Sequence, residues 1–378
     1  MEPAPPAVAV APPRVEFANA LRGLAALFVL MSHHLGQFWL DRSLAVGYAD
    51  MPRLADSVPT PLLVSILNPT RYFDWGAFGV ALFFLISGFV IPFAFERYGW
   101  KGFLAGRFFR IYPTYAVGFT ATLLAIYLGG LYFDRPFPHG LPDMALHYLV
   151  GFRALLGGPN IDGIVWTLDV EVRFYILCAL AAVWLRRGSV LVFLLPAVLA
   201  VGILAALSLG RPLPVSTQFL LFMFIGVAFN LHYRGRLERA PLVFVIATLF
   251  FLFVGAWHLG RLHGISIQLW SYGAALGCFA LAYAGPQGWA RNRLLRFLAD
   301  ISYPLYVVHA IAGFVLLRVL LDRGVPAAAA IAAVLLGALA LAWLIHRFVE
   351  APTHRFGRRL AYRLSRNLGK AGPATVEA

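Results

Sequence analysis

Ten long apolar runs follow one another along the chain, and each is close to the roughly 20 residues that a helix needs to cross a bilayer. Charged residues make up 13% of the sequence, against roughly 25% in a soluble domain, which excludes a large globular core. The sequence therefore predicts an all-α, polytopic membrane protein with about ten transmembrane helices. The runs cover residues 18–40, 74–96, 111–131, 165–185, 189–209, 214–233, 240–259, 266–285, 297–320 and 327–349.

Basic residues gather at every second junction between these runs, for example around Arg107 and Arg110 or at Arg186 and Arg187. The positive-inside rule places such junctions on the cytoplasmic side, so we expect both termini to be cytoplasmic. The net charge of +14 is then a topology signal, aided by anionic lipid headgroups, and does not indicate a nucleic-acid partner. The expected surroundings are a lipid bilayer and no nucleic acid.

The apolar runs form one membrane domain, residues 17–353, between two short tails. Residues 1–16 are rich in Ala and Pro and are expected to be a disordered cytoplasmic tail, and residues 354–378 a basic cytoplasmic tail. Two outer connections, residues 41–73 and 132–164, are longer than a turn requires, which is typical of functional loops. The second connection contains a predicted interfacial helix over residues 144–152.

The first apolar run carries two ionisable side chains, Arg22 and His33, on one face of the predicted helix. Their spacing of eleven residues is almost three turns, or roughly 16 Å along the axis. Ionisable groups within a bilayer are costly unless they meet a partner or a wet cavity, so this pair is a candidate functional site. The alternative is a snorkelling Arg22 and a His33 that is satisfied by a neighbouring carbonyl.

Helix rise per residue places three titratable groups at a similar depth in the outer half of the membrane. His33 rises about 21 Å from the inner side and His309 roughly 18 Å, whereas Glu171 lies roughly 9 Å below the outer surface. We therefore expect these three side chains to lie together, although an ion pair between Glu171 and an arginine remains an alternative. Asp169 and Arg173 are expected to pair on one helical face, and His34 to have a structural role.

Arg107 and Arg110 are three residues apart at the inner end of the third run and face the same way. Two guanidinium groups suit a phosphate-bearing ligand, although anchoring of the topology explains the spacing equally well. A histidine can take a proton from a hydroxyl, and a carboxylate can orient it. Since no Ser or Cys nucleophile accompanies the histidines and no cluster of metal ligands is apparent, we expect direct transfer and no bound metal.

Six motifs, in order, give the sequence its resemblance to the acyltransferase-3 family of integral membrane acyltransferases. They extend over about residues 16–355, and Thr167 stands where the family usually has Ser. The motifs are Leu21-Arg22-Gly23 with His33, Phe83-Phe84-Leu85-Ile86-Ser87-Gly88-Phe89, Arg107-Phe108-Phe109-Arg110-Ile111-Tyr112-Pro113, Trp166-Thr167-Leu168 with Glu171 and Phe174-Tyr175, Ser302-Tyr303-Pro304-Leu305-Tyr306 with His309, and Glu350-Ala351-Pro352.

The resemblance implies transfer of an acyl group, most often acetyl, from cytoplasmic acyl-coenzyme A to a hydroxyl of a glycan or similar acceptor across a bacterial plasma (inner) membrane. It makes His33 and Arg22 the essential pair and places Arg107 and Arg110 near the donor. Acyl-coenzyme A is a co-substrate, and no permanently bound cofactor is expected. In the expected mechanism His33 is the general base, Glu171 fixes its tautomer, and His309 or a tyrosine hydroxyl steadies the oxyanion.

Two other function classes would also use buried polar groups in this setting. A transporter or flippase for a glycan or lipid-linked precursor would line its substrate path with them, but it would not depend on acyl-coenzyme A. A purely structural or assembly subunit would not explain three titratable groups at one depth. The sequence thus favours a membrane acyltransferase, with the transporter as the alternative.

Overall fold

A computed structural model describes residues 15–43, 47–68, 73–210, 217–259, 266–286 and 288–365, and every regular element in those residues is helical. Each of the ten predicted runs is a helix or a series of consecutive helices. They are α1 (Glu16–Ser32) with η1 (His33–Gln37) and α2 (Phe38–Leu40), α5 (Trp75–Val90) with η2 (Ile91–Glu96), α6 (Trp100–Phe133), α8 (Val165–Leu180) with α9 (Ala182–Arg187), η4 (Val190–Phe193) with α10 (Leu194–Ser208), α11 (Gln218–Tyr233), α12 (Arg239–Leu259), α13 (Ser266–Ala284), α14 (Arg293–Val308) with α15 (Ala310–Asp322), and α16 (Ala327–Ile345) with η6 (His346–Glu350) and α17 (Ala351–Ser365).

Six of the described helical segments are long and apolar enough to cross a membrane, and the pair α14 and α15 brings the number to seven. This confirms an all-helical protein with membrane-spanning character in the described part of the chain. The remaining runs are helical but shorter or less apolar, so the figure of ten crossings stays a prediction.

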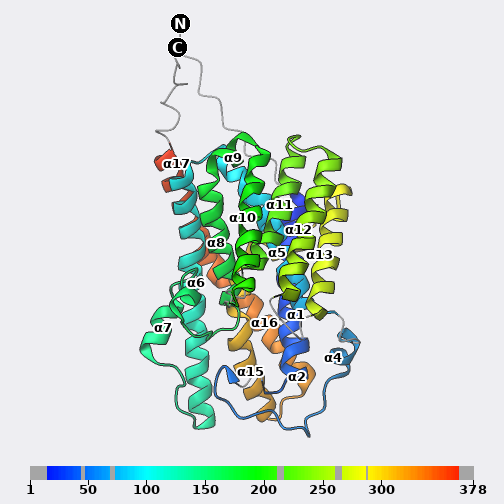
Figure 1. The fold of residues 1–378 in the computed structure, drawn as a ribbon. Helices are drawn as coiled ribbons and strands as arrows, with labels where there is room; N and C mark the ends of the chain where they lie inside the picture. Colours follow the sequence, from blue (N-terminus) through cyan, green and yellow to red (C-terminus); the bar gives the residue numbers. More distant parts are fainter. Residues whose placement is uncertain are drawn as a thin grey trace, which may run out of the picture.

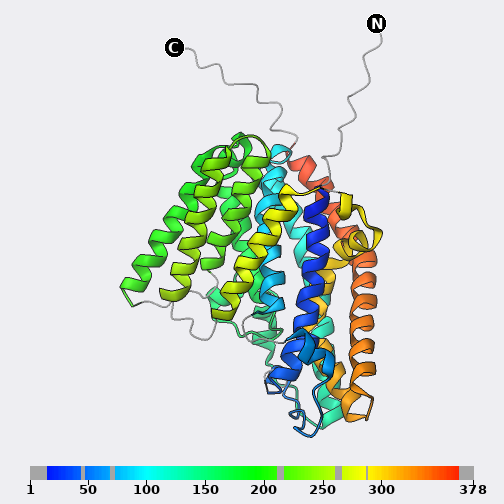
Figure 2. The ribbon, with the colours of Figure 1, turned by 90° about the vertical axis from the view of Figure 1, so that its right-hand side faces the viewer.

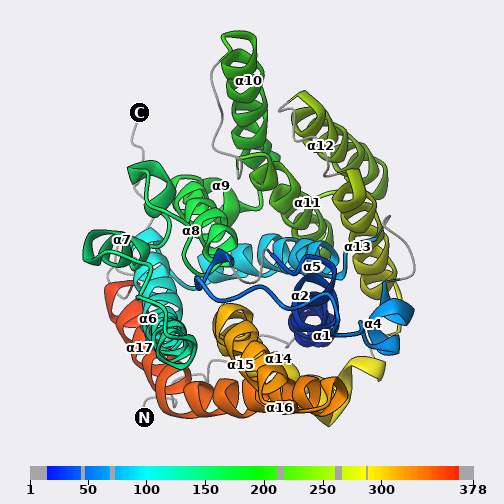
Figure 3. The same ribbon diagram turned by 90° about the horizontal axis from the view of Figure 1, so that it is seen from below.

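The helices run side by side, and the chain enters α1 at the same end of the bundle as it leaves α17 (Figures 1 and 2). Seen along the bundle, α1 and α5 lie near the centre, whereas α10 and α12 project outward (Figure 3). α5 packs against α1, α11 and α13. Gly88 of α5 and Gly226 of α11 have no room for a side chain, because a Cβ on either would collide with the facing backbone. Small residues of this kind let membrane helices approach closely.

At the opposite end, shorter elements cover the bundle: α4 (Leu62–Leu67), α7 (Leu141–His147) and η3 (Arg153–Leu156). The helix that we predicted over residues 144–152 begins earlier and ends earlier, as α7. Pro142 in its first turn favours that start, since proline needs no amide partner there. Gly151, with a φ of +90°, then turns the chain.

Three boundaries differ from the sequence prediction. The ninth run is not one helix, because α14 and α15 meet at a 72° bend at His309. α6 begins at Trp100, so Arg107 and Arg110 lie within a helix and not ahead of it. Part of the predicted C-terminal tail is helical through Ser365 and packs on α6, whereas residues 366–378, like residues 1–14, lie outside the described residues.

Candidate active site

Two cavities follow one another along α1. The inner cavity, nearer the end where α1 begins, has a volume of about 460 Å³ and is lined by Arg22, Arg107, Arg110 and Glu171, among others. The outer cavity, of about 190 Å³, is lined by His33 and by residues from several other elements. Tyr306 and Val80 line both cavities. The two predicted ends of the site are therefore neighbours with a shared wall.

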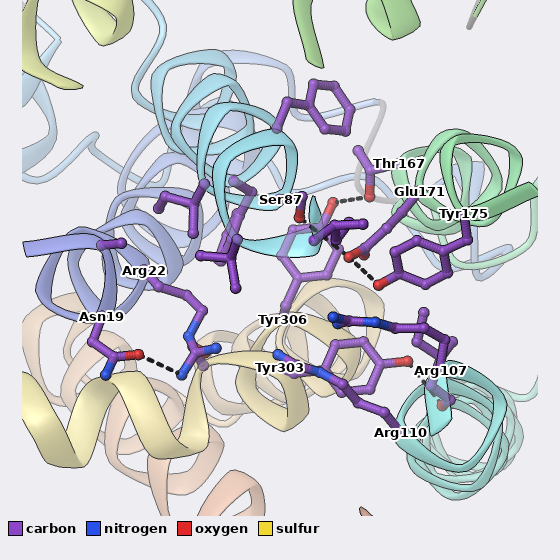
Figure 4. A pocket seen from close by; sticks show the side chains of 18 of the residues that line it. Asn19, Arg22, Ser87, Arg107, Arg110, Thr167, Glu171, Tyr175, Tyr303 and Tyr306 are labelled. Atoms are coloured by element: carbon purple, nitrogen blue, oxygen red, sulfur yellow. Dashed lines mark hydrogen bonds between the residues drawn. The ribbon is translucent and has the colours of Figure 1, made fainter. Parts of the chain in front are cut away.

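The inner cavity brings three guanidinium groups together from two helices (Figure 4). Arg22 comes from α1 and donates to the Asn19 side chain at 3.2 Å, whereas Arg107 and Arg110 come from α6. The Arg107 guanidinium lies 5.3 Å from the centre of the Tyr175 ring, which fixes its orientation. The predicted common face of Arg107 and Arg110 is thus present, and Arg22 joins it. Such a set is well suited to bidentate binding of phosphate oxygens.

Glu171 also belongs to the inner cavity, and the structure does not bring it to His33. Its carboxylate accepts hydrogen bonds from Ser87 at 3.2 Å and from Tyr175 (Figure 4). Glu171 does not orient His33, because His33 lines the other cavity, and that expectation was wrong. The depth of Glu171 was counted from an outer surface, but Val165, where α8 begins, is itself buried, so helix length from that point misplaces Glu171.

His33 and His309 do meet, as predicted. The His33 Nδ1 atom lies 2.9 Å from the Val29 carbonyl and 3.2 Å from Nε2 of His309. Two backbone irregularities set up this contact. His33 begins the π-helical turn η1, a deviation that often marks functional sites, and His309 lies at the break between α14 and α15.

The backbone carbonyls decide how protons are assigned on this histidine pair. His309 Nδ1 faces the carbonyls of Tyr306 at 2.8 Å and Leu305 at 3.1 Å, so it carries the proton and Nε2 is an acceptor. His33 Nδ1–H then donates to Val29 and to His309, which leaves the His33 Nε2 lone pair available as a base. His309 is 1% exposed and contacts Nδ1 of His33, the nitrogen opposite the available lone pair. It therefore has the orienting role that the sequence predicts for Glu171.

The outer cavity contains two carboxylates that sequence reasoning missed, Asp74 and Asp162. Asp74 is the N-cap of α5 and accepts hydrogen bonds from two amides of its first turn, at 2.7 and 3.0 Å. Asp162 lies three residues before α8 and accepts from the amides two and three residues further along, at 3.0 and 2.9 Å. An Asp directly before an apolar run is a typical N-cap, and this signal could have located Asp74. The Tyr115 hydroxyl also donates to Asp162 at 3.1 Å.

Asp162 and His147 form a buried polar cluster under the outer loop. The His147 Nε2 atom lies 3.8 Å from Oδ1 of Asp162 and accepts a hydrogen bond from the Ile161 amide. Burial raises the pKa of Asp162 to about 6 and lowers the pKa of His147 to about 3. His147 is therefore neutral at physiological pH, and its contact with Asp162 is not an ion pair between full charges.

The remaining predicted polar residues have structural partners. Asp169 pairs with Arg153 at 3.0 Å and accepts from the Gly151 amide at 2.7 Å, so the described ion pair is not the expected one with Arg173. The fully buried His34 bonds the His309 carbonyl at 2.9 Å, which confirms its structural role.

Tyr306 lines both cavities, and its hydroxyl pairs with the hydroxyl of Thr167. Its hydroxyl lies 2.6 Å from that of Thr167, so the hydroxyl function at this motif position is retained although Thr replaces Ser. Since Tyr306 lines both cavities, its ring lies at their boundary, where a group passing from one to the other would meet it.

Comparison with known proteins places this geometry in a family. Residues 15–347 match the acyltransferase-3 family model, which is described as an acyltransferase domain. The chain is 28% identical over 303 residues to the exopolysaccharide production protein ExoZ of Rhizobium meliloti (strain 1021), covering 76% of this chain and 92% of that protein. It is 31% identical over 147 residues to nodulation protein 10 of Rhizobium leguminosarum bv. viciae, covering 33% of this chain and 40% of that protein.

No solved structure matches the chain. The family match spans the described helices from α1 to α16, including both cavities and all of the predicted site residues. The chain belongs to the acyltransferase-3 family and is an integral membrane O-acyltransferase.

Proposed function

We propose that the protein transfers an acyl group, most simply acetyl, from cytoplasmic acyl-coenzyme A to a hydroxyl of a carbohydrate acceptor on the far side of a bacterial plasma membrane. The observation that carries this proposal is the pair of adjoining cavities. One contains three arginines and the other a histidine with an available lone pair, and Tyr306 belongs to both. A donor and an acceptor that approach from opposite ends would meet at this boundary.

Coenzyme A would bind at the inner cavity. Its phosphates would pair with Arg107, Arg110 and Arg22, because guanidinium groups match phosphate oxygens in shape and charge. The other walls are largely apolar, with Phe83, Phe84 and Ile91 among them, and suit the uncharged pantetheine arm. This arm would carry the thioester toward Tyr306, which makes the cavity a path between the phosphate site and His33.

His33 would act as the general base in the outer cavity. Its Nε2 takes the proton of the acceptor hydroxyl as the hydroxyl oxygen attacks the thioester carbonyl carbon. The carbon–sulfur bond then breaks, an ester forms, and the coenzyme A thiolate takes up the proton from His33. His309 stabilises the transient imidazolium by accepting from its Nδ1–H, and the Tyr306 hydroxyl donates to the carbonyl oxygen as negative charge develops.

Two separate observations support the orientation of the protein in the membrane and the identity of the acceptor. Alternate basic junctions favour cytoplasmic termini and ten crossings, so the arginine cavity would open toward the cytoplasm, where acyl-coenzyme A is made. The similarity to a protein named for exopolysaccharide production favours a polysaccharide or its precursor as acceptor.

Membranes that contain the protein, supplied with acetyl-coenzyme A labelled in the acetyl group, test the proposal. We expect label in a glycan fraction with the wild type and none above background with His33→Ala at equal protein level. Transfer at the wild-type rate by His33→Ala would refute the histidine mechanism. Movement of a glycan across the membrane without acetyl-coenzyme A would instead support the transporter alternative.

A further inference from the structure

The outer cavity is lined by polar groups that the protein itself leaves without hydrogen bonds. Tyr272 is 1% exposed and lines the cavity, yet its hydroxyl has no hydrogen bond among the described residues. Gln37 and Gln268 line the same space, and their side-chain amides likewise have no described partner. Since these three side chains line the cavity and have no partner among the described residues, their polar groups are available to a polar ligand.

The two carboxylate oxygens of Asp74 differ in their hydrogen bonds. Every described hydrogen bond to its carboxylate ends on Oδ1, from the Ser32 hydroxyl at 3.2 Å and from the amides of Gly76 and Ala77 at 2.7 and 3.0 Å. The Oδ2 atom is left for the cavity that Asp74 lines. Asp162 differs, because both of its oxygens already accept hydrogen bonds from Tyr115 and from backbone amides. Asp74 is therefore the carboxylate that can bind a ligand.

The chemistry of this lining matches a compound with several hydroxyl groups. A carboxylate oxygen only accepts, amides donate and accept, and a tyrosine hydroxyl does both, whereas each hydroxyl of a polyol can take either part. Trp166 and Phe314 add flat apolar walls for the carbon face of a ring. The volume of about 190 Å³ is below the roughly 300–1,000 Å³ of typical ligand pockets, so the cavity holds one ring of the acceptor, and further rings of a glycan would lie outside it.

We propose that the outer cavity binds a single polyol ring and that Asp74 accepts a hydrogen bond from a second hydroxyl, next to the one that His33 deprotonates. Asp74 is thus a specificity residue, because the distance between it and His33 selects which hydroxyl is presented. The inference rests on the proposed function, since it takes His33 as the base.

Asp74→Asn separates the ligand role from the capping role. Asparagine caps helices as well as aspartate does, so Oδ1 can keep its amide partners, whereas an NH₂ group replaces Oδ2. Asp74→Ser is a second variant that keeps a capping oxygen and removes Oδ2. Asn292→Asp, at the exposed N-cap of α14, is the matched control for a cap exchange away from the cavity.

The assay compares trans-1,2-cyclohexanediol with cyclohexanol as acceptors of label from acetyl-coenzyme A. We expect the wild type and Asn292→Asp to prefer the diol, and both Asp74 variants to lower that preference about tenfold or more, with an unchanged KM for acetyl-coenzyme A. Both Asp74 variants retaining the full diol preference would overturn the inference. So would a wild type that labels its membrane acceptor but not the diol. Full activity of His33→Ala on either alcohol would instead refute the proposed function.

Discussion

Replacing His309 with Phe tests how the histidine pair works. In the structure His309 does not line the outer cavity, and its Nε2 faces His33 Nδ1 at 3.2 Å. Phenylalanine keeps a planar ring but cannot accept that hydrogen bond. The Val29 carbonyl, 2.9 Å from the same nitrogen, remains to hold the His33 tautomer. We therefore expect a base that is present and correctly protonated but has lost the group that stabilises its charged form.

The magnitude follows from the change in charge during the reaction. A hydrogen bond between two neutral groups contributes about 0.5–1.5 kcal/mol, and one to a charged group about 1.5–3 kcal/mol. The transition state, in which His33 is becoming an imidazolium, gains the difference, which is about 1–1.5 kcal/mol. Since each 1.36 kcal/mol is a factor of ten in rate, His309→Phe should lower kcat about tenfold. Loss of His33 itself should cost about 10²–10⁴-fold.

Initial rates of acetyl transfer by the purified protein in lipid nanodiscs, at several acetyl-coenzyme A concentrations, measure the effect. His232→Phe is the matched control. It loses the 2.7 Å hydrogen bond from Nδ1 to the Leu237 carbonyl, as His309→Phe loses its Nδ1 bonds to backbone carbonyls, and His232 lines neither cavity. We expect the control to keep the wild-type kcat, and His309→Phe to keep the wild-type donor KM. A His309→Phe rate as low as that of His33→Ala, or equal to the wild type, would refute the orienting role.

Three other predictions concern the donor site, the buried cluster and the packing behind the histidines. Arg107→Lys combined with Arg110→Lys keeps both charges but loses the bidentate geometry, so the KM for acetyl-coenzyme A should rise about tenfold while kcat stays nearly constant; an unchanged KM in steady-state kinetics would remove these residues from the donor site. The buried Asp162, with its pKa raised to about 6, contributes stability that is complete below about pH 4 and lost as the pH rises through 6. The melting temperature of Asp162→Asn relative to wild type should therefore increase between pH 4 and pH 7, and a flat difference would contradict the raised pKa. Gly313→Ala adds a methyl group that collides with the His34 ring and should destabilise the protein by about 1–3 kcal/mol. Gly337→Ala, with open space around it inside α16, should melt at or slightly above the wild-type temperature in the same thermal scan, because alanine favours a helix more than glycine does.

Much of the architecture follows from residue order alone. All ten apolar runs are helical, because a run of about 20 apolar residues in a bilayer must satisfy its own backbone hydrogen bonds. The common height of His33 and His309 could also be predicted, since rise per residue is constant and both helices start from the same side. The shared face of Arg107 and Arg110 follows from the number of residues per turn. These inferences need only positions along each helix.

Other features depend on neighbours that no local pattern contains. Depth arithmetic assigned Glu171 to His33, but α8 begins at the buried Val165, and Glu171 bonds Ser87 and Tyr175 in the other cavity. The 72° break at His309 has no proline at that position, since Pro304 lies within α14. Asp74 reaches the outer cavity because α5 packs closely against α1.

The sequence by itself determined the helices, the order of the motifs, the family and which ionisable side chains lie within the apolar runs. Only the tertiary structure decided which of those residues share a cavity. The physical reason is that a sequence specifies height along each helix, whereas lateral position and rotation come from side-chain packing between helices. Arg22 and His33 lie on one helix in both accounts, but their partners became known only once the other helices were placed around α1.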